Sequence, residues 1–170
     1  MLGVPRGELL HPEPDIVDVQ MSVEHDGARL AGIEATLEEL RSQTGASRVT
    51  LRQNLPGEYA FPVTHESLAP GAGSLFEERT IDLRSQPVAQ EVGGGRQVVQ
   101  DDCASASVDP AFHRMRQVYG GLAAQIVTPV VLYGCVIAIV SVHQLGVQRR
   151  WSPTEIEACA ETAERLAELL

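Results

Sequence analysis

Apolar residues near the start of the chain recur with a helical period over residues 28–43. Leu30, Ile33, Leu37 and Leu40 follow one another at spacings of three, four and three residues, which places them on one side of an α-helix. Two interpretations fit this stripe. Either the helix packs on its own domain, or part of the stripe packs on a second subunit.

Alternation of apolar and polar residues predicts two strands after this helix. In residues 48–53, Val49 and Leu51 alternate with polar side chains, as in a half-buried strand. Residues 58–64 form the next predicted strand, which Pro62 confines to a sheet edge or a bulge. Shorter segments farther along predict a strand at 80–83, a helix at 86–92, a strand at 96–100 and a helix at 110–119.

The longest apolar run predicts a β-hairpin that turns at Tyr133 and Gly134. Leu132 then lies opposite Cys135, a four-residue loop would keep the same register, and directly opposed residues share a face of the sheet. One face then carries Val127, Pro129, Val131, Val136, Ala138, Val140 and Val142, and the other carries Ile126, Thr128, Val130, Leu132, Cys135, Ile137, Ile139, Ser141 and His143. The first face is wholly apolar, whereas the second becomes polar toward one end.

Residues 152–170 predict a final helix. Ser152 as N-cap and Glu155 three residues later form a capping box, and an apolar stripe with glutamates opposite follows. We expect this helix to cover the wholly apolar face of the hairpin, so that the other face lines a cavity under the middle loops. Ala138 and Ile139 should therefore point to opposite sides of the sheet.

Residues 1–27 contain several prolines and acidic residues and predict a partly ordered leader, within which residues 16–23 form one edge strand or a short helix. The predicted domain then spans residues 28–170. The leader lacks the basic start and apolar run of a signal peptide. The longest apolar run, residues 126–142, is too short and too interrupted to span a membrane. These features predict a soluble, cytoplasmic protein without membrane contacts.

Charge and cysteine content narrow the function classes. The formal net charge is −10 and the chain contains no lysine, so its surface should repel the phosphates of nucleic acids. The three cysteines, Cys103, Cys135 and Cys159, are odd in number and far apart. They fit reduced thiols of a cytoplasmic protein better than a disulfide framework.

The order of the predicted elements and three segments resemble the GAF domain family over residues 28–170. The segments are QVVQDD, AAQIVTPVVLYGCVIAIVSVH and RRWSPTEIEACAETAERLAELL. The resemblance implies an α+β fold: an antiparallel sheet with the terminal helices on one face and a small-molecule pocket on the other, under loops around residues 66–122. Members commonly dimerise through their terminal helices, here residues 28–43 and 152–170. They bind cyclic nucleotides, bilins, haem or amino acids, and usually relay occupancy to a partner.

The residues narrow the family's ligand classes. The cyclic-nucleotide motif of the family needs a lysine, which the chain lacks, and the cysteine that attaches a bilin is commonly followed by histidine. Cys103, Cys135 and Cys159 are followed by alanine, valine and alanine. Haem needs one axial histidine, for which His113 and His143 are the candidates. No two histidines have metal-ligand spacing, and the cofactor stays unknown.

Enzymatic activity is not expected, although a thiol-based redox enzyme of the free methionine sulfoxide reductase type is an alternative. Cys103 follows two aspartates, whose charge should raise the pKa of the thiol and weaken it as a nucleophile. Cys135 and Cys159 are expected on opposite sides of the sheet, where they cannot pair. A second alternative is a scaffold with a filled pocket that acts only through protein–protein contacts.

The leading hypothesis is therefore a non-catalytic sensory domain that binds a small-molecule effector. Aromatic walls and sparse polar anchors are typical of such pockets. The candidates are Arg52, Tyr59, Asp102, Phe112, His113, Thr128, Ser141 and His143. Each also has a structural interpretation: Thr128 and Ser141 as ordinary strand residues, His143 as an exposed strand end, and Asp101 and Asp102 as caps of the segment after their strand.

Overall fold

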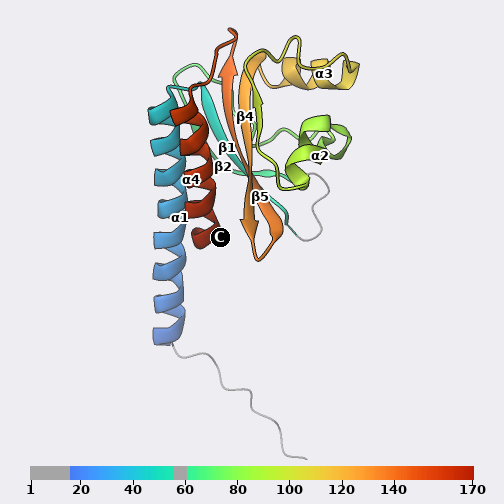
Figure 1. The fold of residues 1–170 in the computed structure, drawn as a ribbon. Helices are drawn as coiled ribbons and strands as arrows, with labels where there is room; N and C mark the ends of the chain where they lie inside the picture. Colours follow the sequence, from blue (N-terminus) through green and yellow to red (C-terminus); the bar gives the residue numbers. More distant parts are fainter. Residues whose placement is uncertain (1–15, 56–60) are drawn as a thin grey trace, which may run out of the picture.

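The computed structural model describes residues 16–55 and 61–170, which fold into one antiparallel sheet with helices on both faces (Figure 1). The sheet order is β2-β1-β5-β4-β3. In chain order the elements are α1 (Ile16–Thr44), β1 (Arg48–Gln53), β2 (Val63–Leu68), the 3-10 helix η1 (Leu83–Ser85), α2 (Pro87–Gly93), β3 (Val98–Gln100), α3 (Pro110–Val118), β4 (Leu122–Leu132), β5 (Cys135–Leu145) and α4 (Pro153–Leu169). The terminal helices α1 and α4 lie side by side on one face, and α2 and α3 lie on the other. This arrangement confirms the α+β architecture predicted from the sequence.

Helix α1 begins at Ile16 and has 29 residues, so the helix expected from residue 28 is only its second half. Of the two alternatives considered for residues 16–23, the edge strand is wrong and the helix is confirmed, as part of this longer helix. The start of α1 extends beyond the sheet (Figure 1). Ile33, Leu37 and Leu40 are buried against the sheet and α4. Leu30 is 45% exposed. Most of the apolar stripe thus packs on its own domain, as the first of the two interpretations expected.

The second strand differs from its prediction. β2 begins at Val63 rather than at residue 58, and residues 56–60 lie outside the described part of the chain. β2 lies at an edge of the sheet, as Pro62 indicated. No strand forms at residues 80–83, where the Asp82 carboxylate instead accepts a hydrogen bond from the Arg84 backbone N–H at the start of η1.

The hairpin turns where predicted, but its register changes after two pairs. Leu132 lies opposite Cys135 and Val131 opposite Val136, whereas Val130 lies opposite Ala138. The extra residue on β5 is a β-bulge, which shifts β4 by one residue relative to β5 and reverses the faces of its side chains.

The predicted faces are therefore correct for β5 from Ala138 onward and wrong for most of β4. Near the turn they are wrong on β5 as well, because Val136 packs on the cavity side and Ile137 packs on the helix side. Ala138, Val140 and Val142 pack under the terminal helices, and Ile139 packs on the opposite side, as expected. On β4 the helix side holds Ala124, Ile126, Thr128 and Val130, while Val127 faces the other way. The faces assigned to Ile126, Val127, Thr128 and Val130 are thus corrected.

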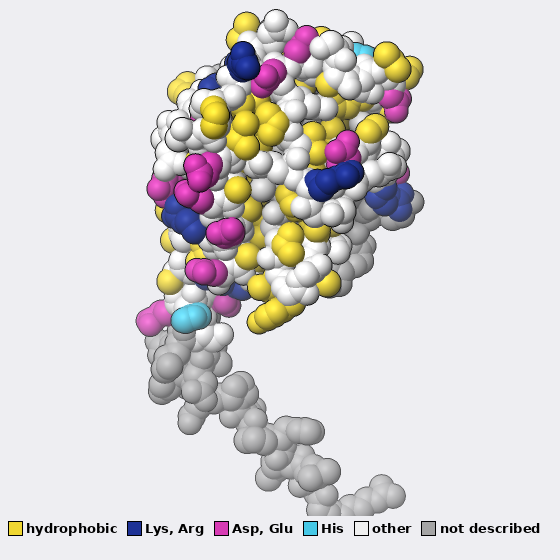
Figure 2. Space-filling model, in the orientation of Figure 1, with side chains coloured by type: hydrophobic (Ala, Val, Ile, Leu, Met, Phe, Trp, Pro, Cys, Tyr) yellow, Lys and Arg dark blue, Asp and Glu magenta, His cyan; other side chains and the backbone are white. Residues whose placement is uncertain are grey.

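The end of the chain closes the core as predicted. The Ser152 hydroxyl accepts a hydrogen bond from the Glu155 backbone N–H, and the Glu155 carboxylate accepts one from the Ser152 backbone N–H, which completes the capping box. Trp151 is buried in the same cluster as Ile156. Acidic side chains gather over the outer surface of α1 and α4 (Figure 2). No helix in the described ranges has both the length and the apolar character of a membrane span.

Candidate functional site

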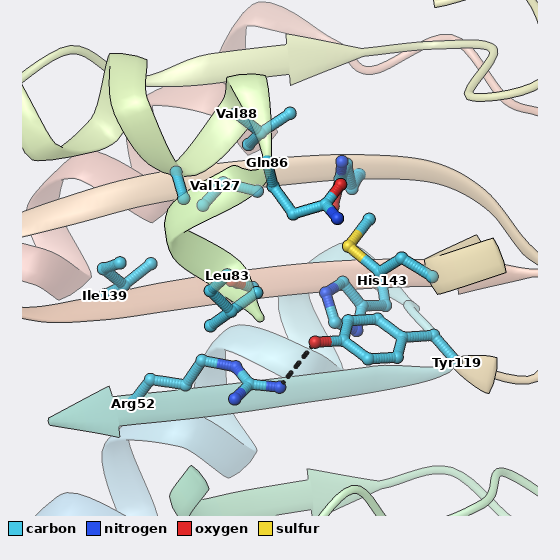
Figure 3. Close-up of a pocket in the computed structure, with 12 residues that line it drawn as sticks. Arg52, Leu83, Gln86, Val88, Tyr119, Val127, Ile139 and His143 are labelled. Carbon is cyan, nitrogen blue, oxygen red and sulfur yellow. Dashed lines mark hydrogen bonds between the residues drawn. The ribbon is translucent and has the colours of Figure 1, made fainter. Parts of the chain in front are cut away.

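A small cavity lies on the sheet face opposite α1 and α4 (Figure 3). Its volume is about 40 Å³. Strands β1, β4 and β5 form its floor, and η1, α2 and α3 with their flanking residues form its roof. Its lining consists of Arg52, Leu83, Gln86, Val88, Ala89, Met115, Tyr119, Gln125, Val127, Ile139, Ser141 and His143.

Two arginines of β1 reach the cavity side because side chains alternate along a strand. Val49 and Leu51 enter the core under the helices, so Arg48 and Arg52 point the other way. The sequence predicts this alternation but not the depth of the arginines, which are 1% and 5% exposed. The roof of η1, α2 and α3 shuts this part of the sheet off from solvent.

Arg48 orients His143 and ties the roof to the sheet. Its Nε donates to Nδ1 of His143 at 3.1 Å, Nη1 donates to the Gly73 carbonyl at 2.6 Å, and Nη2 donates to the Tyr119 carbonyl at 3.0 Å. Burial lowers the pKa of Arg48 to about 10, so the guanidinium stays charged at neutral pH. Because Nδ1 of His143 accepts a hydrogen bond, the proton of the neutral ring lies on Nε2.

Arg52 lies directly on the cavity. Its Nη1 donates to the Phe61 carbonyl and its Nη2 to the Tyr119 hydroxyl, both at 2.9 Å, and the second bond is drawn in Figure 3. Its guanidinium carbon lies 5.6 Å from the centroid of the Tyr119 ring. Burial raises the pKa of Tyr119, so its hydroxyl remains protonated. Within residues 16–55 and 61–170, no carboxylate forms an ion pair with Arg48 or Arg52.

Gln86 points into the same cavity with part of its hydrogen-bonding capacity unused. The residue is 3% exposed and makes no side-chain bond to the start of α2. Its Oε1 is one of two buried side-chain polar atoms in the described residues that have no hydrogen-bond partner; the other is Oγ1 of Thr50. Figure 3 shows the amide directed toward the side of the cavity formed by His143 and Tyr119. Such an atom usually meets water or a ligand.

Three of the eight sequence-based site candidates line the cavity: Arg52, Ser141 and His143. Tyr59 lies outside the described residues. His143 is buried, so the exposed strand end considered for it is wrong.

The other four candidates lie elsewhere. Thr128 is on the helix side of the sheet, where its hydroxyl accepts a hydrogen bond from Gln97, because the bulge reverses its face. Asp102 accepts hydrogen bonds from the Ala104 backbone N–H and the Ser105 hydroxyl, so it caps the turn after β3.

Phe112 and His113 belong to α3 but do not reach the cavity. Phe112 is buried in a second apolar cluster with Met115 and Tyr119. Nδ1 of His113 lies 3.2 Å from Nη1 of Arg116. A cavity of about 40 Å³ also has no room for haem beside His143.

Sequence reasoning missed Gln86, Tyr119 and Gln125. Tyr119 and Gln86 lie at the ends of short helices. The apolar period of such a short segment does not indicate toward which side of the domain a terminal side chain points. Gln125 could have been found only with the correct hairpin register, which places it opposite His143.

The cysteines do not form a reactive pair. Cys103 and Cys159 are buried, and burial raises the pKa of each thiol to about 12. Such thiols carry little thiolate at neutral pH and are poor nucleophiles. Cys135 is exposed at the end of the hairpin, where it lines a groove, whereas Cys159 belongs to the buried helix-side cluster.

A larger open groove adjoins the cavity between α2 and the end of the hairpin. Its volume is about 730 Å³, and Cys135, Val131 and Val136 lie along it. Leu83, Ala89 and Ile139 line both spaces. These three apolar side chains therefore form the wall between the buried cavity and the groove.

Acidification is expected to destabilise the fold through His143. Burial, with smaller contributions from Arg48 and Arg52, holds the pKa of this residue well below its usual value of 6.5. The unfolded chain takes up a proton on this ring below about pH 6.5 and the folded chain does not, so stability is full above that pH and falls below it. The slope is at most about 1.4 kcal/mol per pH unit from this residue. Urea denaturation at pH 7.5 and 5.5 measures it.

His143→Gln is the control for this pH dependence. The variant should lose less stability between the two pH values than the parent protein. His65, whose pKa burial also lowers, remains in both proteins and contributes equally. Equal losses in parent and variant would contradict the role assigned to His143.

Comparisons with known proteins agree with this architecture. The cyanobacteriochrome receptor PixJ has a TM-score of 0.71 at 20% identity, over 85% of this chain and 96% of that chain. The phycoerythrobilin-bound GAF domain from a cyanobacterial phytochrome has a TM-score of 0.69 at 19% identity, over 90% and 88%. The third GAF domain of Slr1393 from Synechocystis has a TM-score of 0.67 at 18% identity, over 82% and 90%. At such identities the likeness shows the fold alone.

No curated protein sequence matches the chain. A sequence model of the GAF domain, however, matches residues 30–170. This span runs from the middle of α1 to the end of the chain and includes every strand of the sheet and the whole lining of the cavity. The chain therefore belongs to the GAF domain family.

Proposed function

We propose that this domain is a non-catalytic regulatory module that binds a small-molecule effector in the cavity between the sheet and α2. The single observation that carries the proposal is the buried, unpartnered Oε1 of Gln86, a residue that lines the cavity together with Arg52. Buried polar groups normally have partners. An effector would supply one here, either a donor to this oxygen or, after a half-turn of the amide, an acceptor for its NH₂ group.

A bilin is not the effector that this site favours. Two similar structures are GAF domains of a cyanobacterial phytochrome with bound phycoerythrobilin and phycocyanobilin. In this chain the cavity has a volume of about 40 Å³ and no cysteine lines it. Cys103 is buried in the second apolar cluster.

Strand β5 supports a route from the cavity to the terminal helices. Its alternate residues Ile139, Ser141 and His143 line the cavity, while Ala138, Val140 and Val142 pack under α1 and α4. A shift of this strand on binding therefore moves both packing layers together. We propose that α1 and α4 carry the change to a partner protein or to a second copy of this chain.

For a homodimer, the N-terminal half of α1 is the better contact of the two proposed helices. Residues 24–31 are exposed, and the start of α1 extends beyond the sheet (Figure 1). On α4 the exposed side carries Glu157, Glu161, Glu164 and Glu168, and a second copy would bring like charges together there.

A thermal-shift screen tests the proposed effector site. The purified chain is screened against amino acids, nucleotides and small organic acids, and a ligand of the site should raise the melting temperature. Ala89 lines the cavity. Ala89→Leu puts a larger side chain into this space and should abolish the rise in melting temperature. Ala35→Leu, the same change at an exposed position of α1, should retain it.

The outcomes separate the sensor from the scaffold. A rise that Ala89→Leu abolishes supports the effector site. No rise with any compound, or a rise that Ala89→Leu leaves intact, would contradict it. The absence of a rise with every compound would favour a domain that acts only through protein–protein contacts of its helices.

A further inference from the structure

The charge of the cavity does not match the charge of the rest of the molecule. The chain carries a formal net charge of −10, yet the cavity side of β1 holds the buried cations Arg48 and Arg52. Neither has a carboxylate at ion-pair distance in the described residues. Burying an unpaired charge costs free energy that a bound anion offsets. The cavity is therefore suited to a negatively charged group.

Hydrogen-bond donors converge on this space. The two hydrogen bonds of Arg52 use two of the five N–H groups of its guanidinium. Nε2 of His143 carries a proton, because Nδ1 accepts from Arg48. The amide of Gln86 can present its NH₂ group after a half-turn that exchanges its nitrogen and oxygen atoms. No aspartate or glutamate lines the cavity to compete with an anion.

The volume restricts the size of that anion. A cavity of about 40 Å³ accommodates roughly three water-sized groups. A carboxylate has three heavy atoms, and its planar shape matches the fork of an arginine side chain. A phosphate is tetrahedral and has five heavy atoms, so it fits the space less well.

The adjoining groove indicates what the carboxylate is attached to. The wall of Leu83, Ala89 and Ile139 is apolar, and the groove of about 730 Å³ beyond it continues along Val131 and Val136. We propose, on the basis of the proposed function, that the effector is an amphipathic carboxylic acid. Its carboxylate binds Arg52 in the cavity, and its apolar chain extends along these three side chains, which line both spaces, into the groove.

A series of straight-chain acids tests both parts of the ligand. Acetate, butanoate, hexanoate and octanoate are titrated into the full chain at pH 7.5 and constant ionic strength, beside hexanamide and hexyl phosphate. Affinity should rise about three- to fourfold for each methylene group buried. Hexanoate should bind at least tenfold more tightly than either of the other two hexyl compounds.

Substitution of Arg52 separates the charge from the apolar contact. Arg52→Gln should weaken hexanoate binding at least tenfold and leave hexanamide binding within about twofold. Arg150→Gln, at an exposed arginine, removes the same charge far from the cavity and should change neither. Circular dichroism shows whether each variant is folded.

Alkylation of Cys135 tests the groove without any change at Arg52. This thiol is exposed and lines the groove, whereas Cys103 and Cys159 are buried. Saturating octanoate should slow its reaction with N-ethylmaleimide at least fivefold, and acetate should not. Cys135→Ala identifies the labelled site.

Three results would overturn the carboxylate assignment: equal affinities for hexanoate and hexanamide, tighter binding of hexyl phosphate, or no protection of Cys135 by octanoate. After any of these results the proposed effector site still holds if some compound raises the melting temperature of the parent protein and Ala89→Leu abolishes that rise. If no compound in either screen stabilises the chain, the carboxylate assignment and the proposed function both fail.

Discussion

Replacing Arg48 by methionine is expected to lower the free energy of unfolding by about 3–5 kcal/mol. The side chain is almost fully buried and donates to the carbonyls of Gly73 and Tyr119 and to Nδ1 of His143. Methionine fills a similar volume but donates no hydrogen bond. All three acceptors would lose this donor, and each unpaired acceptor costs about 1–3 kcal/mol.

Urea denaturation monitored by circular dichroism measures this loss, and Arg150→Met is the matched control. Arg150 is exposed, and the described residues offer it no hydrogen bond or ion pair. The control changes the net charge equally and should shift stability by no more than about 0.5 kcal/mol. Similar losses in the two variants would show that Arg48 matters through net charge and not through its buried contacts.

The burial of Arg48 shows a limit of local sequence patterns. The alternation of Arg48, Thr50 and Arg52 with Val49 and Leu51 predicts the two faces of β1 correctly. It does not indicate how deeply the arginines are buried, although Arg52 was among the candidates for the pocket, because charged residues are seldom buried without a partner. They are buried because η1, α2 and α3, which follow much later in the chain, cover this face. Short elements with weak periodicity give little indication of where they pack.

The hairpin shows how one residue can reverse a prediction. On β5 the sides of Ala138 and Ile139 were predicted correctly. On β4 the bulge moved Thr128 to the helix side and Gln125 to the cavity side. In an almost uniformly β-branched run, either register buries apolar residues on both faces, so the pattern contains no mark of the bulge.

Helix α1 was predicted only where it contacts the rest of the domain. Over residues 28–43, packing imposes the period of Ile33, Leu37 and Leu40. Before residue 28 the helix extends beyond the sheet (Figure 1), and packing imposes no period there. The β-branched residues and Gly27 in this half also have low helix propensity. The same limit applies to the site. Arg52, Ser141 and His143 were predicted because they lie on strands with a clear period. Gln86 and Tyr119 were missed because they lie at the ends of short helices.

Replacing Leu37 by alanine is expected to lower the free energy of unfolding by about 2–5 kcal/mol. Leu37 is fully buried in the cluster that joins α1, α4 and the helix side of the sheet. Truncation removes apolar contacts and leaves a cavity that α1 cannot close, because Ile33 and Leu40 hold the helix in place on either side. Urea denaturation of parent and variant at the same protein concentration measures the loss.

Leu30→Ala is the matched control on the same helix. Leu30 lies two turns before Leu37 and is 45% exposed, so its truncation leaves no enclosed cavity and should cost less than about 1 kcal/mol. A loss comparable to that of Leu37→Ala would contradict the packing of a single chain, because Leu30 would then have to be buried in solution. If such a loss also grew with protein concentration, the molecule covering Leu30 would be a second copy of this chain, as proposed for α1.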